Sequence, residues 1–261
     1  MRETGQTQRR DIATIILAAG KGTRMKSDLA KVLHPVCGRP MLWYPVSIAH
    51  KIGSDKIVVV IGHQADEIKK TMNDDTLLYV YQKEQRGTAH AVMQTEPVLK
   101  DFDGTVFILC GDVPLLQIST LQRLLEFHRE SASDITVLTT IPEDPHGYGR
   151  IIKDERDHVI RIVEHRDASE QEKEITEINT GIYCVEGAFL YHSLAYIETN
   201  NSQKEFYLTD IFEIARRENR KTRAFLLHDP HEAMGINTVE QRDEADRIMN
   251  ARMPARGKAV S

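Results

Sequence analysis

Glycines and cationic side chains are concentrated near the amino terminus, in a stretch whose composition suits phosphate groups. Gly20 and Gly22 can adopt positive φ and let backbone N–H groups approach an anion closely. The cationic residues around the same turn are Lys21, Arg24, Lys26 and Lys31. Such side chains can neutralise phosphate charge. The spacing fits an ordinary glycine turn on a solvated basic surface equally well.

The loop matches neither of two common phosphate-binding motifs. The dinucleotide fingerprint G-x-G-x-x-G requires a third glycine, and Met25 occupies that position. The ATPase motif G-x-x-x-x-G-K-[ST] is absent. A nicotinamide-dependent oxidoreductase is therefore a disfavoured alternative.

A carboxylate that could bind a metal follows an apolar run later in the chain. Asp112 comes after Thr105–Cys110, between Gly111 and the rigid Pro114. A carboxylate at the tip of a buried strand suits a hard cation such as Mg²⁺. Lone aspartates at strand ends are also common as turn residues or caps, so residue type alone leaves both roles open.

A polar loop between an apolar run and a helical pattern could read a planar base. Gln82 and Gln85 carry amides that offer both a donor and an acceptor, and Gly87 lets the backbone approach a ring. A strand-to-helix connection needs no function to be polar, and this simpler interpretation is favoured for the loop by itself.

Residues that could bind a sugar lie in the second half of the chain. Glu164 follows Val159–Val163, and Asn179 lies at the start of another strand-like run. Such side chains can bind hydroxyl or acetamido groups without acid–base chemistry. Gly147 and Gly149 suit either a tight hairpin or a backbone wall against a ligand. Taken separately, these side chains also fit ordinary surface polarity.

Apolar runs that alternate with helical patterns must position these residues. Runs without polar alternation predict strands covered on both faces. The runs are Ile15–Ala19, Ile57–Ile61, Leu77–Tyr81, Thr105–Cys110, Ile135–Thr140 and Arg223–Leu227. Their order predicts an α/β fold with a mostly parallel sheet, helices on both faces and ligands at the carboxyl ends of strands. Ile151–Ile152 and Val159–Val163 are expected to form a smaller antiparallel hairpin on the sugar side.

Three helix starts are predicted from local patterns. Pro40 is expected in the first turn of a helix. The other two starts are capping boxes, at Ser119-x-x-Gln122 and Thr238-x-x-Gln241.

Length and composition predict one domain with a sizeable core. The chain has 261 residues, 41% of them hydrophobic, and we expect one domain over residues 12–253 with flexible ends at 1–11 and 254–261. The net charge of −5 argues against nucleic-acid binding. Three cysteines without C-x-x-C spacing indicate a reducing compartment. The absence of a leader-like segment, or of an apolar stretch of about 18 residues, indicates a cytoplasmic protein with no membrane partner.

Several segments together resemble the sugar-phosphate nucleotidyltransferase family. L-A-A-G-K-G-T-R-M, which starts at Leu17, matches the family signature L-A-A-G-x-G-T-R-M, and Lys31 matches the lysine that follows it. The segments Q-K-E-Q-R-G-T-A-H and G-D-V-P-L-L, and those around Glu164, Asn179 and Asn237, also match in the family's order. The resemblance covers about residues 12–253.

The chain departs from the family pattern at two points. Ala30 stands where the family usually has proline, so we expect a slightly looser turn and no lost chemistry. Longer members continue into an acetyltransferase domain of hexapeptide repeats, and no such repeat occurs here. We therefore expect this chain to lack that second activity.

The resemblance implies a Rossmann-like fold and a role for each matching residue. It implies nucleotide binding by Leu17, Ala18, Ala19, Gly20, Lys31, Gln82, Gly87 and Thr88; sugar binding by Gly149, Glu164 and Asn179; metal binding by Asp112 and Asn237; and catalysis by Arg24 and Lys31. The segment containing Tyr207, Thr209 and Asp210 also resembles the family, but capping and core packing explain it more simply.

The resemblance is strongest to members that transfer a uridylyl group from UTP to N-acetylglucosamine 1-phosphate. It therefore implies a Mg²⁺-dependent enzyme that gives UDP-N-acetylglucosamine and pyrophosphate. One alternative is a sibling enzyme that uses another nucleoside triphosphate or sugar 1-phosphate. Another is a catalytically silent sugar-nucleotide sensor on the same fold.

Overall fold

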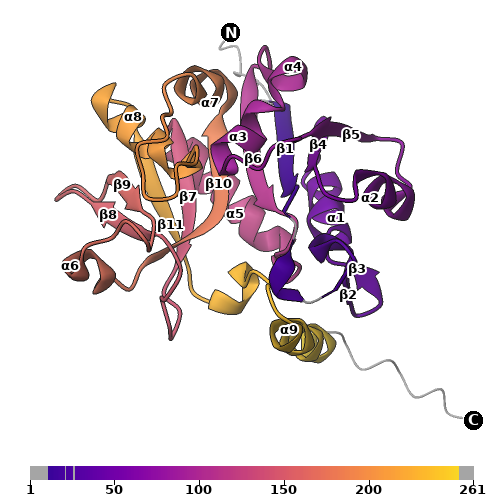
Figure 1. Cartoon of the computed structure of the whole chain (residues 1–261). Helices are drawn as coiled ribbons and strands as arrows, with labels where there is room; N and C mark the ends of the chain where they lie inside the picture. The colour runs from indigo at the N-terminus through magenta and orange to yellow at the C-terminus, as the bar shows by residue number, and fades with distance from the viewer. Residues whose placement is uncertain (1–10, 21, 26, 253–261) are drawn as a thin grey trace, which may run out of the picture.

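One mixed sheet of nine strands runs through this computed structural model, which describes residues 11–20, 22–25 and 27–252. The strand order is β11-β7-β10-β6-β1-β4-β5, and β8 and β9 extend from β10 as a hairpin (Figure 1). The strands are β1 (Asp11–Ala18), β4 (Lys56–Ile61), β5 (Leu77–Tyr81), β6 (Gly104–Cys110), β7 (Ile135–Thr140), β8 (Arg150–Lys153), β9 (Val159–Val163), β10 (Ile178–Glu186) and β11 (Thr222–Leu227). The ends expected to be flexible were 1–11 and 254–261; all of these residues except Asp11 lie outside the described residues, and Asp11 belongs to β1.

Parallel pairing dominates the sheet. β1 pairs in parallel with β4 and β6, β4 with β5, and β7 with β11. β10 runs antiparallel between β6 and β7, and β8 and β9 pair antiparallel with each other. The predicted α/β class, with a mostly parallel sheet and a smaller antiparallel hairpin, is confirmed.

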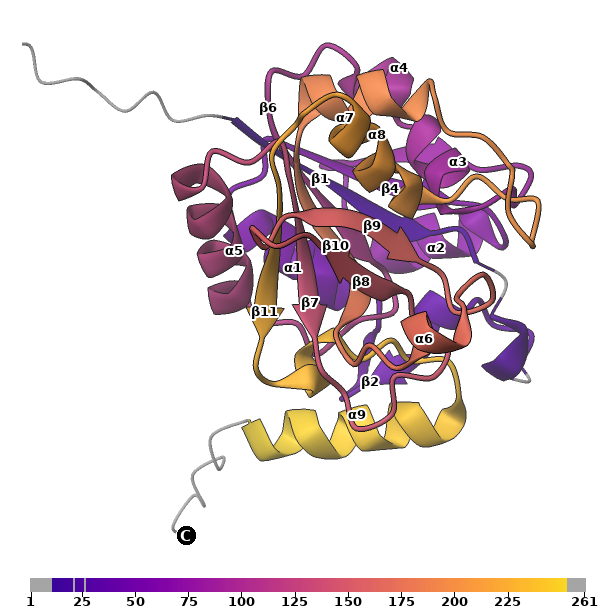
Figure 2. The ribbon, with the colours of Figure 1, turned by 90° about the vertical axis from the view of Figure 1, so that its left-hand side faces the viewer.

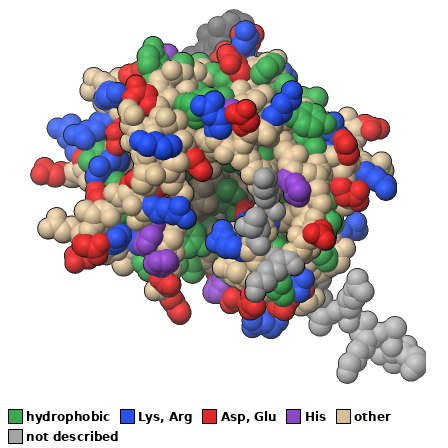
Figure 3. Space-filling view, viewed as in Figure 1, with side chains coloured by type: hydrophobic (Ala, Val, Ile, Leu, Met, Phe, Trp, Pro, Cys, Tyr) green, Lys and Arg blue, Asp and Glu red, His purple; other side chains and the backbone are tan. Residues whose placement is uncertain are grey.

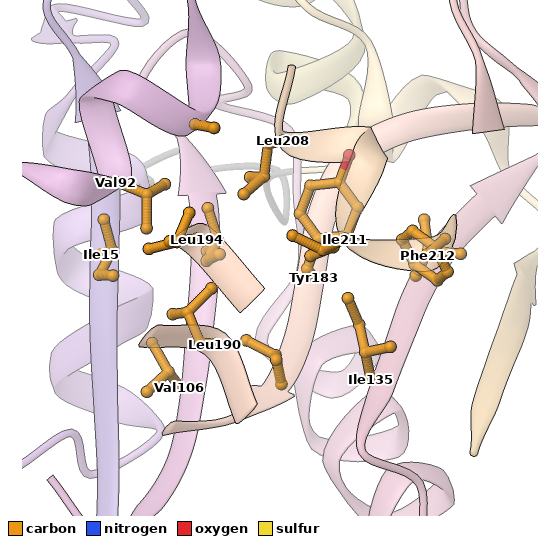
Figure 4. Close-up of a cluster of buried hydrophobic side chains, with 14 of the residues drawn as sticks. Ile15, Val92, Val106, Ile135, Tyr183, Leu190, Leu194, Leu208, Ile211 and Phe212 are labelled. Carbon is orange, nitrogen blue, oxygen red and sulfur yellow. The ribbon is translucent and has the colours of Figure 1, made fainter. Parts of the chain in front are cut away.

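Helices cover both faces of the sheet (Figure 2). Three of them, α1 (Trp43–Lys51), α2 (Ala65–Met72) and α5 (Ile118–Glu130), pack into the apolar cluster on one face. On the other face the cluster takes residues from α3 (Thr88–Met93), α4 (Glu96–Leu99), α7 (Gly187–Leu194) and α8 (Ile211–Arg217) (Figure 4). Ile15 and Ile16 fall in different clusters because successive residues of a strand point to opposite faces. A strand buried on both faces therefore reads as a continuous apolar run.

A third, smaller apolar cluster packs Val36 and Met41 against Ile236 and Ala245. The short hairpin in this region corrects one predicted helix start. Pro40 lies in β3 (Arg39–Pro40), which pairs with β2 (Pro35–Val36), and α1 begins only at Trp43. Cys37 and Gly38 both have positive φ, 44° and 75°, as the tight two-residue hairpin turn requires. Pro40 is therefore in a hairpin, and the prediction that it starts a helix was wrong.

The two predicted capping boxes have different outcomes. At the start of α9 (Val239–Arg252), Gln241 N–H donates to Thr238 Oγ1 at 3.3 Å and Thr238 N–H donates to Gln241 Oε1 at 3.1 Å, which confirms that box. The box at Ser119 was wrong, because α5 begins at Ile118. Instead the carboxylate of Glu232 accepts the backbone N–H of Gln117, at 3.2 Å.

No helix in the described part of the chain is both long enough and apolar enough to cross a bilayer.

Phe212 fills the core beneath the β8–β9 hairpin, so truncating it should destabilise that half of the fold. The side chain is fully buried, and we expect Phe212→Ala to lower the free energy of unfolding by about 3–5 kcal/mol. Ile141→Ala is the matched control, because Ile141 is 51% exposed and should cost less than about 0.5 kcal/mol. Urea denaturation of both variants would test this, and equal costs would contradict the assigned core.

Candidate active site

The glycine-rich loop follows β1 and is held against Lys31. Gly22 has φ of 63°, and a Cβ there would lie 2.4 Å from the Cβ of Lys31, so a side chain at this position has no room. Met25, which replaces the third glycine of the dinucleotide fingerprint, is buried, and its N–H donates to Gly22 O at 3.0 Å. Two of the predicted phosphate-neutralising residues, Lys21 and Lys26, lie outside the described residues.

A charged centre forms where this loop meets the end of β6. The ammonium of Lys31 forms an ion pair with Asp112 Oδ2 and also donates to Asn237 Oδ1 at 2.7 Å. Arg24 donates to the same amide oxygen at 2.7 Å. The chain before α9 is brought to this point by a hydrogen bond of 2.9 Å from Ile236 N–H to Asp112 O. The predicted catalytic cations and predicted metal ligands are thus in direct contact.

The two predicted metal ligands fit a hard cation. Asp112 and Asn237 offer one carboxylate and one amide oxygen, and both contact the same ammonium of Lys31, so they are close enough to share a cation. Among the described residues, no group of three or more His, Cys, Asp or Glu side chains could hold a metal. A two-oxygen site suits Mg²⁺, which keeps several waters and takes further ligands from substrate phosphates.

The turn before Lys31 is supported at Ala30 by the side chain of Gln64. Ala30 has φ of −53°, which a proline could adopt, and its N–H donates to Gln64 Oε1 at 2.5 Å. The amide nitrogen of Gln64 donates in turn to Asp28 O. The side chain of Gln64 therefore supports the turn on two sides, and the expectation that this turn is looser than one with proline stays a prediction.

The loop predicted to read a base, Gln82–Thr88, which we call the base-reading loop for that prediction, leaves β5 beside the glycine-rich loop. The buried Gln82 donates from Nε2 to Gly87 O at 3.0 Å, and its Oε1 accepts no hydrogen bond from any residue that the structure describes. Gln85 Nε2 donates to Ala19 O at 2.6 Å, which ties this loop to the end of β1. The amide that could read a base thus lies in a fixed orientation, with its acceptor free.

The predicted sugar-side residues converge across β8, β9 and β10. Asn179 N–H donates to Gly149 O at 2.9 Å. Asn179 Oδ1 accepts from Gly181 N–H at 2.9 Å and from Tyr183 OH at 3.0 Å, so the side-chain NH₂ is its remaining donor. Glu164 follows β9, and its Oε1 accepts from Thr209 Oγ1 at 3.3 Å. Burial raises the pKa of Glu164, and the hydrogen bond from Thr209 opposes that rise.

A hollow of about 1070 Å³ lies next to this sugar side. Glu164, Asp167, Tyr207 and Asp210 line it, whereas the charged centre does not. Figure 3 shows a depression near the middle of the drawn face, with cationic side chains at part of its margin. The hollow of about 1070 Å³ is therefore adjacent to Glu164, one of the residues predicted to bind a sugar.

Sequence reasoning left out residues that the structure places on the sugar side. Thr209 contacts Glu164, and Tyr207 OH donates to Asp167 Oδ2 at 3.2 Å. Tyr207 and Thr209 are two residues apart in an apolar segment. Side chains with this spacing lie on the same face of an extended chain, so the sequence could have indicated that both polar groups face the same region. Capping accounts for neither side chain, because both bond across to the segment after β9.

Comparison with known proteins finds similar sequences over most of the chain. Residues 13–230 match the family model described as Nucleotidyl transferase. The chain is 47% identical over 243 residues to the Bifunctional protein GlmU of Geotalea daltonii, covering 93% of this chain and 53% of the relative. It is 49% identical over 243 residues to the protein of that name from Pelotomaculum thermopropionicum, with coverages of 93% and 53%. The chain therefore spans about half the length of these relatives.

A similar fold is found among solved structures. A UDP-glucose pyrophosphorylase complexed with UDP-glucose superposes with a TM-score of 0.74, covering 93% of this chain and 100% of that chain. The sequence identity is 16%, so this likeness concerns the fold alone.

Asp210, which lines the hollow, should make stability depend on pH. Burial, followed by the charges of Glu213, Glu164 and Asp167, raises the pKa of Asp210 from its ordinary value of 3.8 to about 6. A raised carboxyl pKa contributes stability that is complete below pH 3.8 and is lost as pH rises through 6. Because water screens this partly exposed group, we expect Asp210→Asn to gain roughly 1 kcal/mol at pH 7.5 and nothing near pH 4.

Urea denaturation at several pH values measures this difference. Asp75→Asn is the control, since Asp75 is exposed and lies outside the hollow. A gain of the same size at every pH would contradict the assigned titration.

Proposed function

Since the chain belongs to the nucleotidyl transferase family, we propose that it transfers a uridylyl group from UTP to N-acetylglucosamine 1-phosphate, giving UDP-N-acetylglucosamine and pyrophosphate. The observation that supports this most is the contact of Lys31 with Asp112 and Asn237, and of Arg24 with Asn237. This charged centre collects the two kinds of group that phosphoryl transfer needs, cations for the phosphates and oxygen ligands for a divalent metal. The proposal includes Mg²⁺ as cofactor.

The chemistry in this proposal needs positioning and charge neutralisation more than acid–base groups. An oxygen of the sugar phosphate, already an anion, attacks the α-phosphorus of UTP, and the bond from that phosphorus to the β-phosphate oxygen breaks. Arg24 and Lys31 stabilise the charge on the triphosphate and on the leaving pyrophosphate. Asp112 and Asn237 would hold Mg²⁺, which supplies further neutralisation of phosphate charge when bound.

The orientation of Gln82 favours a base with an N–H at its reading edge. With Nε2 committed to Gly87 O, the free Oε1 can accept the N3–H of uracil. Cytosine has an acceptor at N3, so it would leave Gln82 Oε1 facing another acceptor, which is costly in a buried site. Thymine also carries an N3–H, so this hydrogen bond does not discriminate between UTP and dTTP.

A panel of nucleoside triphosphates and sugar 1-phosphates, assayed by pyrophosphate release, tests the proposal directly. We expect the highest kcat/KM with UTP and N-acetylglucosamine 1-phosphate, and a large loss with CTP. Equal or better turnover with dTTP or CTP would overturn the uridylyl assignment. Binding of UDP-N-acetylglucosamine without turnover in excess Mg²⁺ would indicate a sensor instead.

The cytoplasm is the proposed compartment. All three cysteines, Cys37, Cys110 and Cys184, are free thiols in the structure. Free thiols are typical of proteins in a reducing compartment.

Replacing Asp112 by asparagine should reduce turnover far more than stability. The change preserves shape but removes the charge proposed to hold Mg²⁺, so we expect kcat to fall by roughly two or more orders of magnitude. The free energy of unfolding should change by less than about 1 kcal/mol, because the ion pair with Lys31 is partly exposed. Asp103→Asn, at the other end of β6, is the matched control and should retain wild-type kcat. A wild-type rate in Asp112→Asn would remove this residue from the site.

Variants on the sugar side and the base side should have different kinetic effects. Asn179→Ala should raise the KM for the sugar phosphate, since a lost hydrogen bond to a neutral group costs about 0.5–1.5 kcal/mol. It should leave the KM for UTP unchanged. Gln82→Ala should instead reduce discrimination between UTP and CTP. Steady-state kinetics with each substrate varied in turn measure both effects.

Tyr183→Phe is the control for Asn179, because it removes only the internal hydrogen bond to Asn179 Oδ1. We expect it to raise the KM for the sugar phosphate less than Asn179→Ala does. If Asn179→Ala weakened UTP and sugar phosphate equally, the proposed division between base and sugar sides would be wrong.

A further inference from the structure

Glu232 is a buried carboxylate on which three donors at the start of α5 converge. It belongs to the short helix η4 (Pro230–Ala233), in the connection between β11 and α9, and it is 6% exposed. Its Oε2 accepts the backbone N–H of Gln117 at 3.2 Å and Thr120 Oγ1 at 2.6 Å. Its Oε1 accepts Gln117 Nε2 at 2.9 Å. Glu232 therefore caps α5 from a distant part of the chain, where its negative charge suits the positive end of the helix.

These hydrogen bonds connect the two segments that carry the predicted metal ligands. Asp112 lies in the turn between β6 and α5, and Asn237 lies between η4 and α9. Nearer to the charged centre, Ile236 N–H donates to Asp112 O at 2.9 Å. The two segments are thus joined at one place by this backbone bond and at another by the carboxylate of Glu232.

The side chain of Asn237 is oriented by bonds within its own segment. Its Nδ2 donates to Gly235 O at 3.1 Å, and its backbone N–H donates to Gln241 Oε1 at 2.7 Å. The amide oxygen is thereby turned toward the charged centre, where it accepts from Lys31. Because these bonds are internal to the segment, the distance from Asn237 to Asp112 depends on where the whole segment is placed.

Burial prevents water from easily replacing the carboxylate of Glu232. Thr120 is 3% exposed, and Ala233, next to Glu232, belongs to the apolar cluster that contains Leu116. A buried donor without a partner costs more free energy than an intact hydrogen bond usually contributes. Loss of the carboxylate would therefore favour a shift of the 230–237 segment relative to the start of α5, and the shift would carry Asn237 with it.

We propose that Glu232 is a positioning residue for the divalent cation, because it fixes the separation of Asp112 and Asn237. This inference rests on the proposed function, in which those two side chains hold Mg²⁺. Mg²⁺ demands near-ideal octahedral geometry with short bonds to oxygen, so the separation of two protein ligands affects its affinity strongly. Glu232 acts only through the two segments that it joins.

Titration of the full chain with Mn²⁺, followed by electron paramagnetic resonance of the free ion, measures metal affinity without turnover. Glu232→Gln keeps the size of the side chain, but it leaves a single acceptor oxygen and turns an NH₂ group toward the NH₂ group of Gln117. We expect this variant to bind Mn²⁺ roughly 10-fold more weakly, at the lower end of what outer-shell partners of metal ligands contribute. The Mg²⁺ concentration that gives half-maximal turnover should rise in parallel.

An exchange of the two side chains tests whether the hydrogen bonds are responsible. In the double variant Glu232→Gln with Gln117→Glu, the amide oxygen introduced at position 232 can accept from Thr120 Oγ1 and from the backbone N–H at position 117. Its NH₂ group can donate to the carboxylate introduced at position 117. We expect the double variant to recover wild-type Mn²⁺ affinity, whereas Gln117→Glu alone places two carboxylates together and should not have that affinity.

Phe212→Ala is the control for a merely structural role. The buried Phe212 lies in the core cluster on the other face of the sheet, so its truncation should lower stability and leave Mn²⁺ affinity unchanged. Unchanged affinity in Glu232→Gln, a loss that the exchange does not recover, or an equal loss in Phe212→Ala would each overturn the proposed role of Glu232.

The outcomes separate this inference from the proposed function. Wild-type turnover of UTP with N-acetylglucosamine 1-phosphate is measured first and tests the proposed function by itself. An active enzyme whose Mn²⁺ affinity does not depend on Glu232 would contradict only the positioning role. Mn²⁺ affinity that falls in Glu232→Gln and returns in the exchanged pair would support that role whichever nucleotide the enzyme uses.

Discussion

Parallel pairing between β1 and β6 is the constraint on which the candidate active site depends. Leu17 lies opposite Cys110, and Gly111 N–H extends this pairing by donating to Leu17 O at 2.9 Å. A Cβ on Gly111 would lie only 3.0 Å from that oxygen, so glycine permits the close approach. The glycine-rich loop and Asp112 thus follow the carboxyl ends of two neighbouring strands, β1 and β6, on the same side of the sheet. This is also where the strand order changes direction, the usual ligand site of such sheets.

The charges at the carboxyl ends of β1 and β6 are not matched one to one. Arg24 and Lys31 share one amide oxygen of Asn237, so two cations lie together and, among the residues that the structure describes, a single carboxylate, that of Asp112, contacts them. On the sugar side, Asp210 lies among other carboxylates, which together with burial raise its pKa. Natural proteins often retain such locally unfavourable groups where a ligand must be bound.

Local sequence patterns were sufficient for the elements and insufficient for contacts between distant segments. The runs Leu77–Tyr81 and Ile135–Thr140 are strands with the predicted bounds. Strands inside a sheet that is covered on both faces can be predicted because they appear in the sequence as continuous apolar runs. The antiparallel place of β10 between β6 and β7 depends on pairing across the sheet, which no local pattern reveals. The hydrogen bond from Thr209 to Glu164 likewise joins residues 45 positions apart. Resemblance to a family gathered candidate site residues, but it could not supply the contacts among them.

The pairing of Ala30 with Gln64 suggests how this chain and its relatives can differ without loss of the turn. Proline at position 30 would fix φ through its ring and would offer no N–H to bind, whereas alanine needs a partner for its buried N–H. Gln64, in left-handed backbone conformation, provides that partner from the loop after β4, the strand that pairs with β1. Positions 30 and 64 should therefore covary among homologues, with proline at the first position relaxing selection for glutamine at the second.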